Sequence, residues 1–213
     1  MRNTMRTIGK LCIFGFVMVA PALAQNQMVN APSPAVSGPA YDLSVGYTRL
    51  SMPIPSAGRA NFNGLDFAGG IDLSRRWGAT LDSNYLYTPA ILDTHHQGYV
   101  LSLYAGPVFY PIEHRNTRVF VRALAGMGLI DGAVPITESQ DFHGWLVRPS
   151  YAVGGGVEQY VSGQLSVRIN GDYLRTSFYD AAGAVQPQNN IRLTLSFVFR
   201  LKQRPHRSSA QLQ

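Results

Sequence analysis

The chain has 213 residues, of which 46% are hydrophobic and 14% are charged, and its formal net charge is +6. Residues 1–24 contribute +3 and residues 200–213 contribute +4, which leaves the stretch between them at −1. The charge therefore excludes a broad basic surface for nucleic acid on the body of the protein, and the length suffices for one domain with a real core.

Residues 1–24 have the pattern of a secretory signal peptide. Their first ten residues are cationic, residues 11–20 are apolar, and residues 22–24 (Ala-Leu-Ala) fit a small-residue cleavage site. The apolar stretch is much shorter than the ~20 residues that a spanning helix needs, which argues against a retained membrane anchor. We therefore expect export and cleavage before Gln25. The single cysteine, Cys12, lies in this segment, so the mature protein is expected to have no disulfide.

The rest of the chain divides into a linker, one domain and a tail. Residues 25–40 are rich in proline, serine, alanine and asparagine, which is typical of a flexible linker. Residues 41–200 show period-2 alternation of apolar and polar residues and no convincing helical period. The alternation predicts an all-β domain, and residues 201–213 then form a basic C-terminal tail.

The alternation occurs in eight segments, which predicts eight strands. Each segment places apolar side chains on one face and polar side chains on the other, because successive side chains of a strand point to opposite sides. Residues 99–110 are the least regular, since Val100 and Val108 join the polar side. The predicted strands are residues 41–48, 65–73, 79–87, 99–110, 119–128, 151–158, 165–173 and 191–200.

The acidic residues indicate which face contacts lipid. None of the 12 falls on an apolar face, and those outside the polar faces lie between strands. A carboxylate that faces lipid costs several kcal/mol of desolvation, so its exclusion predicts apolar faces turned to a membrane and polar faces turned inward. The acids on the polar faces are Asp42, Asp66, Asp72, Asp82, Glu158 and Asp172.

The links between the predicted strands alternate in length. The long ones are residues 51–62, 89–97, 130–145 and 175–188, and the short ones centre on residues 75–76, 112–116 and 162–163. Outer-membrane barrels have this asymmetry, with brief periplasmic turns and longer outside loops. We therefore predict an eight-stranded antiparallel up-and-down transmembrane β-barrel.

A soluble barrel with an apolar interior, like that of the lipocalins, is the alternative, because alternation alone does not say which face points inward. The residues between Lys10 and Lys202 include no lysine, whereas soluble surfaces use lysine freely. The polar faces also combine clustered glycines with both signs of charge, which suits a narrow lumen. Both observations favour lipid outside.

The chain also resembles a known family, the small outer-membrane barrels related to the OmpA transmembrane domain and the porin-like β-barrel domain. The resemblance covers residues 41–200 and lies in residues 105–109 (AGPVF), 154–158 (GGGVE) and 168–173 (RINGDY). It implies a barrel in the cell outer membrane, with the barrel assembly machinery as a partner during biogenesis. Family members commonly end on an aromatic residue, but here Phe199 is followed by further residues, so an internal insertion signal and a periplasmic extension both remain open.

The polar faces carry the candidate functional residues. In an eight-stranded barrel these faces share an interior only wide enough for side chains, so opposite charges would pair there and fill the lumen. A gated ion path is the alternative. The predicted lumen charge network consists of Asp66, Asp72, Asp82, Arg122, Glu158, Arg168, Asp172 and Arg192.

Other chemistry has weaker support in the sequence. His95 and His96 with Asp93, and His143 with Asp141, would lie in loops, where solvated histidines are the default and a metal site is the alternative. Ser83 is the clearest hydroxyl on an outward face, but no histidine accompanies it there as a base. The sequence has no phosphate-binding glycine loop and no zinc-spaced cysteines and histidines, so we expect no cofactor, no metal and no catalytic residue.

The sequence thus predicts a non-enzymatic outer-membrane barrel with a structural, adhesive or weak porin-like role. Its expected partners are outer-membrane lipid and an unidentified ligand of the long loops, and not nucleic acid. A membrane-embedded lipid A-modifying hydrolase and a soluble carrier are the alternatives.

Overall fold

The computed structural model describes residues 39–54, 58–92, 97–114, 116–132, 134–137, 140–142, 145–179 and 185–201. The expected signal peptide, nearly all of the linker and the tail after Leu201 lie outside these residues. None of the described residues belongs to a helix that would be long and apolar enough to span a bilayer.

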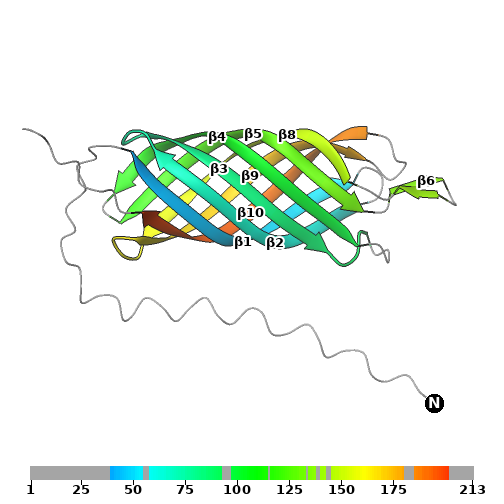
Figure 1. Ribbon diagram of the computed structural model, residues 1–213, viewed down its shortest axis with the longest axis horizontal. Coiled ribbons are helices and arrows are strands. Elements are labelled where there is room, and N and C mark those ends of the chain that lie inside the picture. Colours follow the sequence, from blue (N-terminus) through cyan, green and yellow to red (C-terminus); the bar gives the residue numbers. More distant parts are fainter. Residues whose placement is uncertain are drawn as a thin grey trace, which may run out of the picture. The chain divides into compact units, whose positions relative to one another are not determined.

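Eight long strands pair edge to edge into a closed barrel (Figure 1). Each strand is antiparallel to its neighbours, and the first pairs with the last, Tyr41 lying opposite Leu201, which closes the wall. The predicted eight-stranded antiparallel barrel is therefore confirmed. In order around the barrel, the strands are β1 (Ala40–Ile54), β10 (Val185–Leu201), β9 (Leu165–Tyr179), β8 (Trp145–Tyr160), β5 (Thr117–Gly132), β4 (Gly98–His114), β3 (Trp77–Thr88) and β2 (Gly58–Asp72).

The two ends of the barrel differ in their connections. We call the end that joins β1 to β2, β3 to β4, β5 to β8 and β9 to β10 the long-link rim, and the opposite end the short-turn rim. β1 begins and β10 ends at the short-turn rim. In the β5–β8 connection, which the sequence predicts as a loop over residues 130–145, β6 (Val134–Thr137) and β7 (Gln140–Phe142) pair with each other and form a separate two-stranded sheet.

Two of the predicted long links are largely strand. The sequence predicts a link over residues 51–62, but β1 and β2 stay paired as far as Ile54 and Gly58. The predicted link over residues 175–188 is likewise mostly strand, because β9 and β10 remain paired out to Tyr179 and Val185. These two predictions are wrong.

The reason is that the contrast between the two strand faces reverses near the long-link rim in β1 and disappears in β10, where inward Gln188 and Asn190 and outward Asn189 are all polar. Arg49 is exposed on the outside there, whereas Leu50 and Met52 are buried inside. Between this level and the short-turn rim, the outward residues are mostly apolar and the inward residues mostly polar. A search for one continuous apolar face therefore ends the strand too early.

Alternate residues of each strand point outward and inward. On the outside Leu43, Val153 and Ile169 are 54%, 63% and 61% exposed, and on the inside Asp82 and Glu158 are completely buried. β4 follows the same rule, since Val100 and Val108 point inward with the polar residues, the side on which the sequence places them.

Glycines allow neighbouring strands to approach closely inside this narrow barrel. A Cβ atom on Gly126 would lie 1.9 Å from the carbonyl oxygen of Leu103, and one on Gly106 would lie 2.0 Å from that of Ala123. No side chain fits at such distances without displacing backbone. Glycine at these positions is thus a requirement of the wall itself.

Candidate functional site in the barrel lumen

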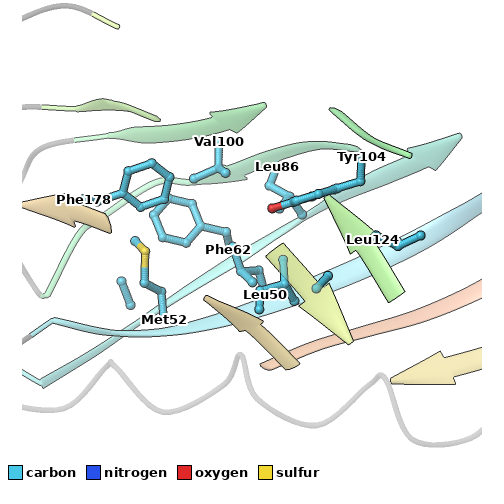
Figure 2. Close-up of a cluster of buried hydrophobic side chains, with 11 residues drawn as sticks. Leu50, Met52, Phe62, Leu86, Val100, Tyr104, Leu124 and Phe178 are labelled. Atoms are coloured by element: carbon cyan, nitrogen blue, oxygen red, sulfur yellow. The ribbon is translucent and has the colours of Figure 1, made fainter. Parts of the chain in front are cut away.

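The lumen is filled by side chains and consists of two zones. Near the long-link rim it contains a cluster of apolar side chains, with Phe62, Phe178 and Met52 pointing toward one another (Figure 2). We call this zone the apolar plug. The alternation in the sequence indicates a polar lumen and does not predict this plug. Its members are Leu50, Met52, Ala60, Phe62, Leu86, Val100, Tyr104, Leu124, Ala152, Leu174 and Phe178.

The second zone contains a closed ring of ion pairs, which we call the central quartet. Arg122 of β5 and Arg192 of β10 each bridge two aspartates. The nitrogen–oxygen distances from Arg122 are 3.0 Å to Asp82 and 2.7 Å to Asp172, and those from Arg192 are both 2.8 Å. Asp82 lies on β3 and Asp172 on β9, so the ring links four strands across the lumen.

The quartet satisfies its own charges. Nε and Nη2 of Arg122 donate to Oδ1 and Oδ2 of Asp172 at 2.9 and 2.7 Å, the paired geometry that a planar guanidinium favours. All four side chains are buried, and opposite charges alternate around the ring. Because each buried ion has two partners of opposite sign, the cost of removing it from water is offset.

Asp66 joins the quartet through an amide and not through an arginine. The Nδ2 atom of Asn84 donates to Asp66 at 2.9 Å and to Asp82 at 2.8 Å. The hydroxyl of Ser102 in turn donates to the amide oxygen of Asn84. Asn84 therefore separates two buried carboxylates and supplies each with a donor, which limits their mutual repulsion.

Another cluster lies close to the short-turn rim, around the carboxylate of Glu158. Arg168 donates to it from Nη2 at 2.8 Å, Arg200 from Nη2 at 3.2 Å and the Ser166 hydroxyl at 2.6 Å. Arg168 also lies 3.7 Å from Asp42. The cluster ties β8, β9 and β10 to the first strand, β1.

A separate pair completes the charged zone. Arg118 donates to Asp72 at 2.7 Å, and its guanidinium carbon lies 3.2 Å from the centre of the Tyr110 ring. A cation over an aromatic face is attracted by the ring quadrupole, and the pair is buried, so both contacts act with little screening by water.

Glycines make room for the buried carboxylates. A Cβ atom on Gly154 would lie 2.2 Å from Oδ1 of Asp172, and one on Gly70 would lie 2.6 Å from Oδ2 of Asp42. The first glycine of the run at residues 154–156 is thus explained by the quartet, because it lies opposite Asp172 and leaves room for its carboxylate.

A cavity of about 10 Å³ borders Asp42, Tyr110, Arg122 and Arg168. That is room for about one water molecule. No group of His, Cys, Asp and Glu within the described ranges is arranged to hold a metal ion.

The structure places all of the residues of the expected charge network in the lumen but distributes them over several groups. Asp82, Arg122, Asp172 and Arg192 form the quartet, and Asp66 reaches it through Asn84. Glu158 and Arg168 form part of the cluster near the short-turn rim, and Asp72 pairs elsewhere, with Arg118.

Several lumen residues are missing from that expected network. Arg118 lies just before the predicted strand over residues 119–128, although its spacing from Phe120 and Arg122 continues the same alternation. Asp42 and Arg200 occupy predicted polar faces and would have been found by extending the network to the strand ends. Asn84 carries no charge, and sequence alone gives no sign that it bridges two acids.

The remaining candidate groups have different outcomes. Ser83 points outward on β3, and the residues paired with it are Phe67 and Leu103, both apolar. Asp93, His95, His96 and His143 lie outside the described residues, as does the side chain of Asp141.

No protein-family model matches the chain, and no curated protein matches it in sequence. Solved structures do match in shape. Neisserial surface protein A (NspA) superposes with a TM-score of 0.60 at 11% identity, covering 77% of this chain and 99% of NspA.

Two further structures agree with this match. Ail, the attachment invasion locus protein of Yersinia pestis, gives a TM-score of 0.54 at 14% identity, covering 76% of this chain and 98% of Ail. The outer membrane protein OprG from Pseudomonas aeruginosa gives 0.52 at 9% identity, covering 77% and 96%. This chain therefore has the fold of the small eight-stranded outer-membrane β-barrels.

Proposed function

We propose that this chain is a non-enzymatic outer-membrane protein whose sealed barrel serves as a structural support for the connections at its long-link rim. The observation that carries the proposal is the contrast between the two faces of the wall, apolar outside and ion-paired inside. An adhesive role of those connections is compatible with this architecture.

The outer face supports a lipid environment. Leu81 and Leu193 are 54% and 58% exposed on the outside, whereas Asp172 and Arg192 behind the wall are buried. A soluble carrier barrel would have the opposite arrangement, with an apolar cavity and a polar exterior. A closed barrel also leaves no unpaired strand edge in hydrocarbon.

Aromatic side chains near both rims fit two membrane interfaces. Trp77 and Phe109 contact each other near the short-turn rim, with ring centres 4.8 Å apart. Tyr99 contacts Tyr87 near the long-link rim at 5.1 Å. Amphipathic rings favour the headgroup level of a bilayer, so the two groups bracket an apolar band.

The filled lumen argues for a sealed barrel and against an open pore. The apolar plug occupies one zone and the quartet crosses the other. A hydrated ion would have to displace buried, paired side chains, which cost more to separate than surface pairs do. The weak porin-like role therefore needs a rearrangement that the other roles do not.

Within the described strands, the surroundings of the outward Ser83 give no support to a lipid-modifying enzyme. Ser83 has apolar neighbours on both adjacent strands, and a nucleophilic serine needs a base within hydrogen-bond reach. Mass spectra of lipid A from cells with and without the gene test this part. We expect identical spectra, and a changed acyl pattern would show that the protein is an enzyme.

Labelling with a lipid-soluble photoreactive probe tests the membrane assignment. Protein refolded into vesicles should be labelled at Leu193 and Val167 and spared at Asp172 and Arg168, because only the former pair faces lipid. Protein that remains monodisperse without detergent, or that labels at the aspartate and arginine, would refute the proposal.

A further inference from the structure

The outward face carries its charged side chains at one end only. In the described strands, the charged residues in outward register are Arg49, Arg59, Asp131 and Arg175, and all of them lie toward the long-link rim. The outward face near the short-turn rim is uncharged in the same strands. The exposed arginines at the short-turn rim, Arg75 and Arg76, lie in the turn between β2 and β3 and not on the outward face of a strand.

Two of the arginines directly follow tyrosines on the same face. Arg49 is two residues beyond Tyr47, and Arg175 is two residues beyond Tyr173, in each case toward the long-link rim. Both tyrosines are about half exposed, at 56% and 52%. Since tyrosine favours the boundary of the hydrocarbon, the next outward residue lies at headgroup level.

The arginines gather on one side of the barrel. Arg59 is on β2, Arg49 on β1 and Arg175 on β9, and β2, β1, β10 and β9 are consecutive in the wall. Asp131 lies apart from them on β5, beyond β8. The three cations therefore share one side of the barrel, with the apolar Leu193 of β10 directly beside Arg49, and we call them the rim arginine patch.

An uncharged hydrogen-bonding residue lies directly beside each of two patch arginines. Asn63 is paired with Arg49, and Asn189 is paired with Arg175, both in outward register. Asn63 already accepts a hydrogen bond from the Tyr47 hydroxyl at 2.9 Å. An amide beside a guanidinium offers additional donors to an anion with several oxygens, such as a phosphate.

Among the described residues, the rim arginine patch has no internal counter-ion. Arg49, Arg59 and Arg175 are exposed, and within the described part of the chain none of them makes an ion pair. The lumen arginines of the central quartet, by contrast, each have two carboxylate partners. Charges that serve only for solubility have no reason to collect on one side at the level of the headgroups.

We propose that the rim arginine patch binds phosphate groups of anionic lipid headgroups in the leaflet that surrounds the long-link rim. Arginine is suited to this ligand because its planar fork donates two parallel hydrogen bonds to phosphate oxygens. The inference rests on the proposed membrane location and adds to it the chemistry of one interface.

The test compares two double variants with equal loss of charge. R49Q/R175Q removes cations from the patch, and R75Q/R76Q removes exposed cations from the short turn between β2 and β3. Folded, detergent-solubilised protein is titrated with lipid A, with dephosphorylated lipid A and with inorganic phosphate. We expect R49Q/R175Q to bind lipid A about 30-fold more weakly than the wild type, or about 2 kcal/mol at about 1 kcal/mol for each arginine.

The control should bind lipid A as the wild type does, dephosphorylated lipid A should bind weakly to all three proteins, and inorganic phosphate should not compete. Equal affinity of the wild type and R49Q/R175Q would refute the patch, and so would equal losses in both double variants. Competition by inorganic phosphate would identify a site for the free anion instead of a lipid. Insertion into phosphatidylcholine vesicles, measured separately, reports on the proposed function without any contribution from phosphate-bearing anionic lipid.

Discussion

Arg192 and Asp172 lie directly opposite each other on β10 and β9, and both Nε and Nη2 of the arginine donate to the same oxygen, Oδ2, at 2.9 and 2.8 Å. Oδ1 of the same carboxylate receives Nε of Arg122 at 2.9 Å, so a local cross-strand pair is continued across the lumen. The quartet is thus both part of the sheet and a link between distant strands.

Replacing Arg192 with leucine should destabilise the barrel strongly. Asp82 and Asp172 would then share a single guanidinium, that of Arg122, and breaking a buried ion pair from one side costs about 3–5 kcal/mol. Urea unfolding in vesicles gives the free energy. As a control, R75Q removes the exposed pair with Glu113 and should cost less than ~1 kcal/mol. Similar losses in the two variants would contradict the importance of the quartet.

Gly154→Ala should be costly although it adds one methyl group. Its Cβ atom would lie 2.2 Å from Asp172 Oδ1 and 2.3 Å from the carbonyl oxygen of Gly171, so the quartet or the strand pairing must shift. We expect a loss of about 1–3 kcal/mol in folding free energy, as for other overpacked sites. Gly163→Ala, with nothing within 4 Å of the added atom, should change stability little. The prediction fails if both variants unfold at the same denaturant concentration.

Two phenylalanines on the same strand should respond differently to truncation. Phe62 points into the apolar plug and is completely buried, whereas Phe67 points outward and is 50% exposed. Phe62→Ala leaves a cavity and should cost about 3–5 kcal/mol. Phe67→Ala should cost less, because lipid chains fill the space that the ring leaves. Unfolding in vesicles measures both, and a larger loss for the outward position would refute the assignment of faces.

Planar-bilayer recordings should show no resolved conductance for the wild-type protein, since the plug and the quartet fill the lumen. Removing one plug side chain together with two opposite charges, in F62A/D82A/R192A, should permit small current steps, because it opens both zones and leaves Arg122 and Asp172 paired with each other. Heat-modified migration on gels confirms that the variant is folded. Wild-type currents as large as those of the variant would show that the lumen is open.

The sequence predicts the architecture well because the alternation is physically enforced in the middle of each strand. Outward residues such as Leu193 contact lipid and are apolar, whereas inward residues such as Arg192 pair with other charges and are polar. The alternation of apolar and polar residues along the strand therefore shows which face each one occupies. Toward the long-link rim this contrast reverses in β1, as at Arg49 and Leu50, and there the links between β1 and β2 and between β9 and β10 are predicted too long. The alternation of apolar outward and polar inward residues holds only in the part of the strand that contacts hydrocarbon.

The pairing of the lumen charges is harder to predict than their position. Alternation shows that Arg122 points inward, but its partners, Asp82 and Asp172, depend on the register and stagger of strands far apart in the chain. The apolar plug is hidden for a related reason, since Phe62 lies in a segment that reads as a loop. Both the ion pairs and the apolar plug form only when the barrel closes and brings these strands together.

The pairing of Tyr41 with Leu201 has a kinetic consequence. Until β10 pairs with β1, both edge strands of the open sheet present unpaired amide and carbonyl groups. Pairing these edges brings together residues that are separated by almost the entire domain in sequence. Contacts of such high sequence separation form slowly and leave the intermediate prone to aggregation. Deletion of β10 should therefore yield an aggregated, insoluble chain and not a smaller barrel. With seven strands, the first and the last strand of the sheet would be parallel and could not form the antiparallel pairing that closes the wall.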